Sequence, residues 1–168
     1  HDGCSGTVMK IDYSSIVDAL SRHERVAFQF SGGKDSVALL LLLKPYWDLF
    51  TVYHCVTGDE HPDTTKLVEH FKQQVPNFEY IYGRSPEVRA QLGLPSDIVP
   101  WQSAMSGRIL GITNTTPIID RLTCCYHSIM APLHERMFTD GITLVIRGQK
   151  KSDELKGSLN SGDIDAGI

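Results

Sequence analysis

Residues 31–36 read Ser31-Gly32-Gly33-Lys34-Asp35-Ser36, and this stretch decides how the fold is interpreted. It follows an apolar run, residues 26–30, that is typical of a buried β-strand. A leucine-rich run that is typical of a helix comes next, from Asp35 or Ser36 to Lys44. Adjacent glycines allow a tight turn and a close approach of the backbone to a ligand. Because a helix start adds unpaired N–H groups and the positive end of a dipole, the stretch predicts a phosphate-binding loop.

The lysine of this loop is expected to supply most of the affinity for a phosphate. A lysine ~4 Å from a phosphate contributes roughly 4 kcal/mol at an effective dielectric constant near 20, whereas the helix dipole contributes ~0.3–1 kcal/mol. Asp35 would cancel Lys34 if both side chains faced the same phosphate. We therefore expect Asp35 to point away, to cap the helix or to hold a Mg²⁺ ion.

Three further runs of β-branched and aromatic residues predict strands, and helical patterns lie between them. This alternation indicates an α/β fold, with a parallel twisted sheet and helices on both of its faces. Ligands of such sheets bind at the carboxyl ends of the strands, where the strand order reverses. The expected strands cover residues 26–30, 50–56, 78–82 and 143–147. The expected helices begin at Ser14 or Ser15, at Asp35 or Ser36, and at about Asp63. The third of these helices is expected to end near Val75.

Three segments depart from this pattern within what we expect to be a single domain over residues 1–168. Residues 39–43 are five consecutive leucines, which leave the second helix no polar face and predict that it is buried. Residues 94–121 show little periodicity, and a stretch of this kind inside a compact domain is usually a functional loop or a misassigned element. Residues 157–168 are polar, acidic and glycine-rich, so we expect that the native protein continues beyond them or that a mobile stretch follows.

The composition excludes several classes of protein. The net charge of −4 comes with no basic stripe, which disfavours binding to nucleic acid. The longest apolar run, residues 37–43, is far shorter than the ~20 residues that span a bilayer. The first ten residues lack the pattern of a secretory signal, and the four cysteines do not form a secreted disulfide framework. We therefore expect a cytoplasmic protein that does not bind membranes.

Two more segments follow expected strands and are candidates for the ligand site at the carboxyl ends of the strands. Thr57-Gly58-Asp59 forms either a simple turn into the next helix or part of the ligand site. Arg147-Gly148-Gln149-Lys150 is either a solvated basic loop or a source of positive charge for a sulfate or second phosphate. We favour the ligand role for both, because the carboxyl ends of parallel strands meet at one edge and arginine suits such anions.

The adjacent cysteines Cys124 and Cys125 allow three interpretations. They are small helix residues with at least one of them buried, or a strained vicinal disulfide, or thiolate ligands of an iron–sulfur cluster. A zinc site that adds His127 is also conceivable, since residues i and i+3 share a helix face. Cys55 lies in an apolar strand and is expected in the core.

Several of these segments together resemble one family. Residues 31–36 resemble the SGGKDS loop of the PP-loop superfamily, and residues 56–64 resemble the D-T-G-x-x-x-P-E-T stretch of the sulfonucleotide reductases, with Val56 in the place of the first Asp. Residues 124–133 are similar to C-C-x-x-R-K-x-x-P-L, with His127 in the place of the family's Arg. Residues 94–100 and 147–153 resemble further segments of the family, and the shared order covers most of residues 26–156.

The resemblance implies an adenine nucleotide α-hydrolase-like three-layer sandwich that binds adenylyl sulfate or phosphoadenylyl sulfate. It implies that a cysteine on a C-terminal arm attacks the sulfur, and that thioredoxin or a similar thiol releases sulfite from the thiosulfonate. It also implies a [4Fe–4S] cluster held by the C-C pair and a later C-x-x-C. The sequence contains neither that second pair nor the cysteine segment of the catalytic arm, so the nucleophile is not placed.

Two other functions stay open. A PP-loop ATP pyrophosphatase or sulfurtransferase would use ATP and Mg²⁺ to thiolate tRNA or DNA, although the acidic balance of the chain does not favour a nucleic-acid substrate. The other is a nucleotide-binding module without chemistry of its own. A homo-oligomer is compatible with each of these functions.

Overall fold

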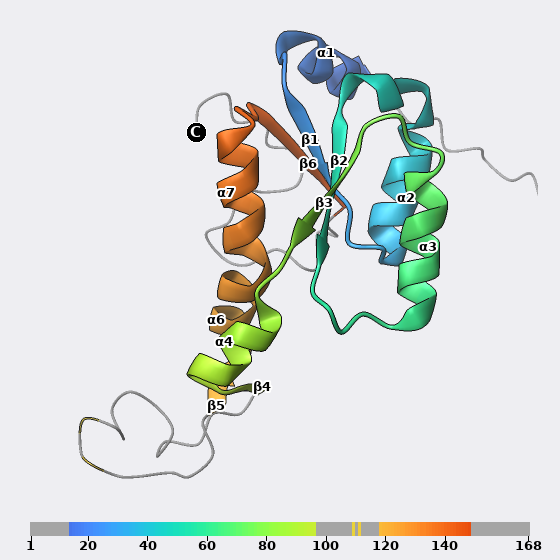
Figure 1. Ribbon diagram of the computed structural model, residues 1–168. Coiled ribbons are helices and arrows are strands. Elements are labelled where there is room, and N and C mark those ends of the chain that lie inside the picture. Colours follow the sequence, from blue (N-terminus) through green and yellow to red (C-terminus); the bar gives the residue numbers. More distant parts are fainter. Residues whose placement is uncertain (1–13, 97–108, 110, 112–117, 149–168) are drawn as a thin grey trace, which may run out of the picture.

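The computed structural model describes residues 14–96, 109, 111 and 118–148, and its centre is a four-stranded parallel sheet (Figure 1). Each strand lies within one residue of a predicted segment, because a short apolar run bounded by turn residues is a strong local determinant of strand structure. The predicted α/β fold is confirmed. The strands are β1 (Val26–Gln29), β2 (Thr51–Val56), β3 (Phe78–Tyr82) and β6 (Leu144–Arg147).

The strand order β3-β2-β1-β6 contains one reversal, and it lies beside β1. The chain moves outward from β1 through β2 to β3, then returns to the other side of β1 to form β6. Gln29 is opposite Arg147 where β1 and β6 end. Parallel sheets hold ligands at such a switch point. The topology therefore brings the segments that follow β1 and β6 to the same edge.

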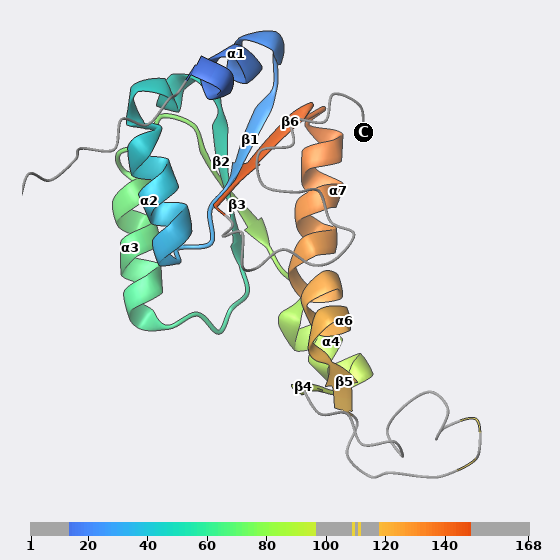
Figure 2. The same cartoon turned by 180° about the vertical axis from the view of Figure 1, so that it is seen from behind.

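Helices α2 (Lys34–Leu42) and α3 (Pro62–Lys72) cover one face of the sheet, as both views show (Figures 1 and 2). The helix predicted from about Asp63 is confirmed as α3, and its Val68 and Phe71 are buried against the strands. Helix α1 (Ser14–Arg22) adds Leu20 to the same core. Further members of this core are Phe28, Phe30, Leu40, Leu43, Trp47, Phe50, Val52 and Val75.

Helix α2 corrects two predictions. It begins at Lys34, whereas the predicted start was Asp35 or Ser36. It is also not buried on every side: Leu40 is fully buried, whereas Leu41 is 49% exposed and Leu42 is 42% exposed. A helix that packs on a sheet buries only the side facing it, so an uninterrupted run of leucines leaves some in solvent. A 3-10 turn, η1 (Lys44–Leu49), ends the helix.

The opposite face of the sheet is covered by α7 (Ala131–Thr139), which confirms helices on both faces. A smaller core of Ala27, Tyr53 and Ile81 from the strands packs against Leu133 and Met137 of this helix. The chain reaches α7 through α6 (Arg121–Cys125) and a five-residue π-helical turn (Tyr126–Met130), with α4 (Ser85–Leu92) beside them. The sequence patterns did not predict α4 or α7.

The stretch at residues 94–121 is less irregular than we predicted. Its ends form β4 (Leu94–Ser96) and β5 (Ile118–Asp120), which pair in parallel as a separate two-stranded sheet. Residues 97–108, 110 and 112–117 lie outside the described part of the chain. None of the helices in the described part is both long enough and apolar enough to cross a membrane.

Candidate functional site

The loop between β1 and α2 has a backbone that requires glycine at its first turn. Gly32 has a φ of +75°, in the left-handed region that residues with a side chain rarely adopt. A Cβ at this position would also lie 2.9 Å from the Cγ2 of Thr64 on α3. Glycine is therefore needed both for the turn and for the close packing of the loop on α3.

Hydrogen bonds within the loop hold it in this shape. The Ser36 hydroxyl donates to the carbonyl of Gly33 at 2.8 Å and lies 3.0 Å from the Ser31 hydroxyl. Ser36 is buried, and its hydroxyl stabilises the turn from the side of the protein interior. Gly33 occupies the N-cap of α2 and makes no side-chain capping hydrogen bond. Asp35 lies inside the first turn, so it is not the N-cap residue of this helix.

The end of β6 packs directly against the start of α2. A Cβ on Gly148 would lie 2.9 Å from the carbonyl oxygen of Asp35 and from the Cα of Ser36. Only a residue without a side chain permits this approach of two backbones. The contact holds Arg147 beside the phosphate loop, although the two segments are more than a hundred residues apart in the sequence.

A cavity of about 340 Å³ opens at this edge of the sheet, a volume at the lower end of the range for small-molecule sites. Five of the predicted site residues line it: Ser31, Ser36, Thr57, Arg147 and Gly148. Six others adjoin the cavity along the chain without lining it: Gly32, Gly33, Lys34, Asp35, Gly58 and Asp59. Gln149 and Lys150 lie outside the described residues. The remaining lining residues are Gln29, Phe30, Tyr53, His54, Cys55, Glu60, Ile129, Met130 and Leu133.

The π-helical turn provides the apolar wall of the cavity through Ile129 and Met130, with Leu133 of α7 beyond them. Pro132 has no N–H, so it does not bond to the carbonyl of Ser128 four residues earlier. That carbonyl accepts instead from the N–H of Arg84, at 3.0 Å.

This bond brings the end of β3 very close to the π-helical turn. A Cβ on Gly83 would lie 2.7 Å from the Ser128 carbonyl oxygen. The proline and the glycine together place the apolar wall over the ends of the strands.

The loop after β2 places two carboxylates near the cavity. Glu60 lines it and accepts hydrogen bonds from the backbone N–H groups of Thr57 and Gly58. Burial raises the pKa of Glu60, but these N–H groups outweigh burial and hold it below its ordinary value. Asp59 accepts from the Thr57 hydroxyl at 2.8 Å and forms an ion pair with Arg89 of α4. Asp59 thus ties the loop to α4, and its role as a ligand contact stays a prediction.

A comparison with protein families identifies the chain. Residues 25–154 match the family model of the phosphoadenosine phosphosulfate reductase domain, which is more than half of the chain. The chain belongs to this family. A comparison with curated proteins gives no match. The match confirms the resemblance to the sulfonucleotide reductases, and it covers every residue that lines the cavity.

The three cysteines among the described residues of this reductase-family domain occupy different environments. Cys124 is buried in a small cluster with Val88 and Ile119, and Cys125 is exposed. Cys55 is half-buried: it packs against the smaller core, as expected, and it also lines the cavity. Burial raises the pKa of Cys55 to about 11, with smaller contributions from the neighbouring Glu60 and Cys125. At neutral pH, Cys55 is therefore a neutral thiol inside the site.

The described residues of the domain fit a metal centre poorly. Within residues 14–96 and 118–148, no three side chains of His, Cys, Asp or Glu are grouped to hold a metal ion, and Cys124, Cys125 and His127 do not form such a group. A [4Fe–4S] cluster normally takes four cysteines. The buried Cys124 and the exposed Cys125 face different surroundings.

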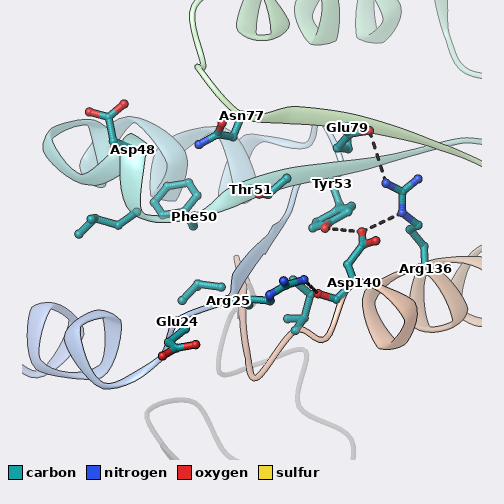
Figure 3. Close-up of a pocket in the computed structure, with 13 residues that line it drawn as sticks. Glu24, Arg25, Asp48, Phe50, Thr51, Tyr53, Asn77, Glu79, Arg136 and Asp140 are labelled. Atoms are coloured by element: carbon teal, nitrogen blue, oxygen red, sulfur yellow. Dashed lines mark hydrogen bonds and ion pairs between the residues drawn. The ribbon is translucent and has the colours of Figure 1, made fainter.

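A second cavity, of about 410 Å³, lies at the opposite edge of the domain, where the strands begin (Figure 3). Its centre is Asp140, which accepts from the Tyr53 hydroxyl at 2.7 Å and from the Arg136 Nε at 2.8 Å. Figure 3 also shows Arg25 against the Asp140 carbonyl, a bond of 2.6 Å. The Tyr53 hydroxyl, followed by Arg136, holds the pKa of Asp140 below its ordinary value, against the opposing effect of burial. We interpret this network as a connection between the end of α7 and the sheet.

The sequence motifs missed the cavity residues that come from inside strands and helices. Tyr53 and Cys55 alternate along β2 and so share the face that looks toward α7, a period-2 pattern that was available in the sequence. Glu60 directly follows the predicted site segment at residues 57–59, so its position in the sequence was a signal for the site. Ile129, Met130 and Leu133 carry no motif, and only the packing of α7 brings them to the site.

Proposed function

We propose that the protein is a sulfonucleotide reductase that binds adenylyl sulfate or phosphoadenylyl sulfate in the cavity of about 340 Å³ and converts its sulfate to sulfite. One observation carries this proposal. The phosphate loop and Arg147 meet at the switch point of the sheet, held by the contact of Gly148 with the start of α2. A helix start that follows two glycines, with an arginine beside it, is suited to the anionic groups of such a nucleotide. The apolar wall is suited to the adenine.

The proposed reaction needs a thiolate that attacks the sulfur of the sulfate. A new S–S bond forms while the bond between sulfur and the bridging oxygen breaks, so that the adenosine phosphate leaves with the bonding electrons. A second thiolate then attacks the resulting thiosulfonate, forms a disulfide and releases sulfite. The two thiols are oxidised, and the sulfur of the sulfate is reduced by two electrons.

We assign the attack to a thiol other than Cys55. The thiolate is the reactive form of a cysteine, and with a pKa of about 11 only a very small fraction of Cys55 is ionised at neutral pH. The nearby Glu60 carboxylate disfavours the thiolate further. Thioredoxin or a similar donor is the proposed source of the electrons. The role of Cys55 in our proposal is to line the site as an uncharged side chain.

The test is to incubate the full-length protein separately with adenylyl sulfate, phosphoadenylyl sulfate and ATP, in each case with reduced thioredoxin, and to measure sulfite and pyrophosphate. We expect sulfite from a sulfonucleotide and no pyrophosphate from ATP. Pyrophosphate from ATP without sulfite from either sulfonucleotide would overturn the proposal in favour of a pyrophosphatase with Mg²⁺. Tight binding without turnover would instead identify a binding module. Iron and acid-labile sulfide in the purified protein would test a cluster separately.

A variant of the loop links the activity to this site. We expect Lys34→Ala to bind adenylyl sulfate about 10- to 100-fold more weakly, because it loses a hydrogen bond to a charged group. Lys44→Ala is the matched control, since Lys44 is also exposed but lies just beyond the other end of α2. Equal affinity of both variants and the wild type would remove the phosphate loop from the site.

A further inference from the structure

The candidate nucleotide cavity has a negative charge at one end, which is unusual for a site that receives anions. Glu60 lines the cavity from the loop after β2, whereas the phosphate loop follows β1 and Arg147 ends β6. Neighbouring strands are about 4.8 Å apart, so about 10 Å separates the ends of β2 and β6. The cavity thus has a cationic end at β6 and an anionic end at β2.

The backbone holds the carboxylate of Glu60 in place. One of its oxygens accepts from the N–H of Thr57, and the other accepts from the N–H of Gly58 at 3.1 Å. The turn that presents these two N–H groups includes Gly58, which has a φ of +86°. Because both oxygens are bound, the side chain cannot turn out of the cavity without losing two hydrogen bonds.

No cation in the described part of the chain neutralises Glu60. Arg89 of α4 reaches this loop, but it is paired with Asp59. The remaining ion pairs of residues 14–96 and 118–148 involve other carboxylates. Glu60 therefore presents a full negative charge to whatever occupies this end of the cavity.

The two candidate substrates differ in charge at one position. Both carry phosphate and sulfate on the 5′ side of the ribose, and phosphoadenylyl sulfate carries an additional phosphate on the 3′ oxygen. The phosphate loop and Arg147 suit the 5′ groups. With the 5′ groups at the ends of β1 and β6, the ribose lies toward the neighbouring strand β2 and Glu60. A carboxylate in this neighbourhood accepts hydrogen bonds from ribose hydroxyls and repels a phosphate, as the acidic residue of NAD-binding sheets does.

We propose that Glu60 binds the ribose hydroxyls and excludes a 3′-phosphate, so that the substrate is adenylyl sulfate rather than phosphoadenylyl sulfate. This inference rests on the proposed function, because it requires the nucleotide to occupy the cavity at the switch point. It assigns Glu60 as a residue that determines specificity. Glu60 does not take part in the transfer of sulfur.

The test is isothermal titration of the full-length protein with AMP and with adenosine 3′,5′-bisphosphate, which differ only in the 3′-phosphate. We expect the wild type to prefer AMP by about 100-fold, an order of magnitude set by two like charges in contact near a protein surface. In Glu60→Gln we expect this preference to fall to less than about tenfold, mainly through tighter binding of the bisphosphate. Glu87→Gln is the matched control, because it neutralises an exposed carboxylate of α4 that does not line the cavity.

The outcomes separate the inference from the function on which it rests. If the wild type binds the bisphosphate as tightly as AMP, or if Glu60→Gln keeps the wild-type ratio, the role of Glu60 is overturned while nucleotide binding stands. If neither nucleotide binds, both the site and the inference fail. A urea unfolding curve shows whether Glu60→Gln is folded. If the variant is not folded, the ratio of the two affinities in the wild type tests the role of Glu60 by itself.

Discussion

Gly148 is the residue at which β6 touches the phosphate loop, and its replacement by alanine tests the geometry of the switch point. The added Cβ would lie 2.9 Å from the carbonyl oxygen of Asp35 and from the Cα of Ser36. Both are backbone atoms in the first turn of α2, so no side-chain rotation relieves the overlap. Because carbon atoms in contact are about 3.5 Å apart or more, β6 and α2 must separate by about half an ångström.

The expected cost follows from this overlap. Forcing an extra methyl group into a packed contact costs about 1–3 kcal/mol. For a domain of this size, a loss of about 2 kcal/mol lowers the melting temperature by about 4–8 °C. The separation also moves Arg147 away from the phosphate loop. Since a misplacement of about 1 Å costs about 100-fold in a positioned site, we expect adenylyl sulfate to bind about tenfold more weakly.

Urea unfolding and isothermal titration of Gly148→Ala measure both effects. Ala38→Ser is the matched control, because it adds one atom to the same helix at an exposed position. Such surface substitutions usually change stability by less than about 0.5 kcal/mol. If Gly148→Ala unfolds at the urea concentration of the wild type and binds with the same affinity, β6 does not pack against the loop as described. The proposed site would then lose its cationic side.

Two further predictions concern groups with a shifted pKa. Removing the hydroxyl bonded to Asp140, in Tyr53→Phe, should cost about 1–3 kcal/mol at neutral pH. The pKa of Asp140 is lowered in the folded protein, so this difference in stability should persist down to about pH 4 and shrink as the pH falls further. Urea unfolding over a pH series measures it. A difference in stability that does not depend on pH would contradict a hydrogen bond from Tyr53 to the ionised Asp140. Cys55, with a pKa of about 11, should react with iodoacetamide more slowly than the exposed Cys125 at pH 7.5, and its rate should rise about tenfold per pH unit up to that pKa. Mass spectrometry of timed samples distinguishes the two sites, and equal rates at pH 7.5 would show that the Cys55 thiol is ionised far more readily than its burial allows.

The local parts of the fold were predictable because they depend on neighbours in the sequence. Short apolar runs predicted all four strands of the central sheet, and the glycines of the phosphate loop predicted its turn. The same reasoning failed for α7, whose only buried apolar residues are Pro132, Leu133 and Met137. A helix that buries so few residues shows little periodicity of apolar residues in its sequence. Its helical structure is stabilised by the sheet that it covers.

Burial was predicted less well than secondary structure. Five consecutive leucines suggested a fully buried helix, yet Leu41 and Leu42 face solvent. Cys55 was expected in the core, yet it is only half-buried there and also lines the cavity. In both cases the sequence describes how apolar a residue is, whereas burial depends on which elements stand on each side of it. Only the arrangement of the helices determines that.

By itself, the sequence determined the strands of the central sheet, the glycine turn after β1 and the family to which the chain belongs. These depend on patterns within a few residues, and backbone and side-chain preferences act at that range. The tertiary structure alone decided that β6 lies beside β1, that Gly148 meets the start of α2, and that Glu60 and Cys55 share a cavity with Arg147. These contacts join segments that are far apart in the chain, and the packing of the whole sheet and its helices selects them.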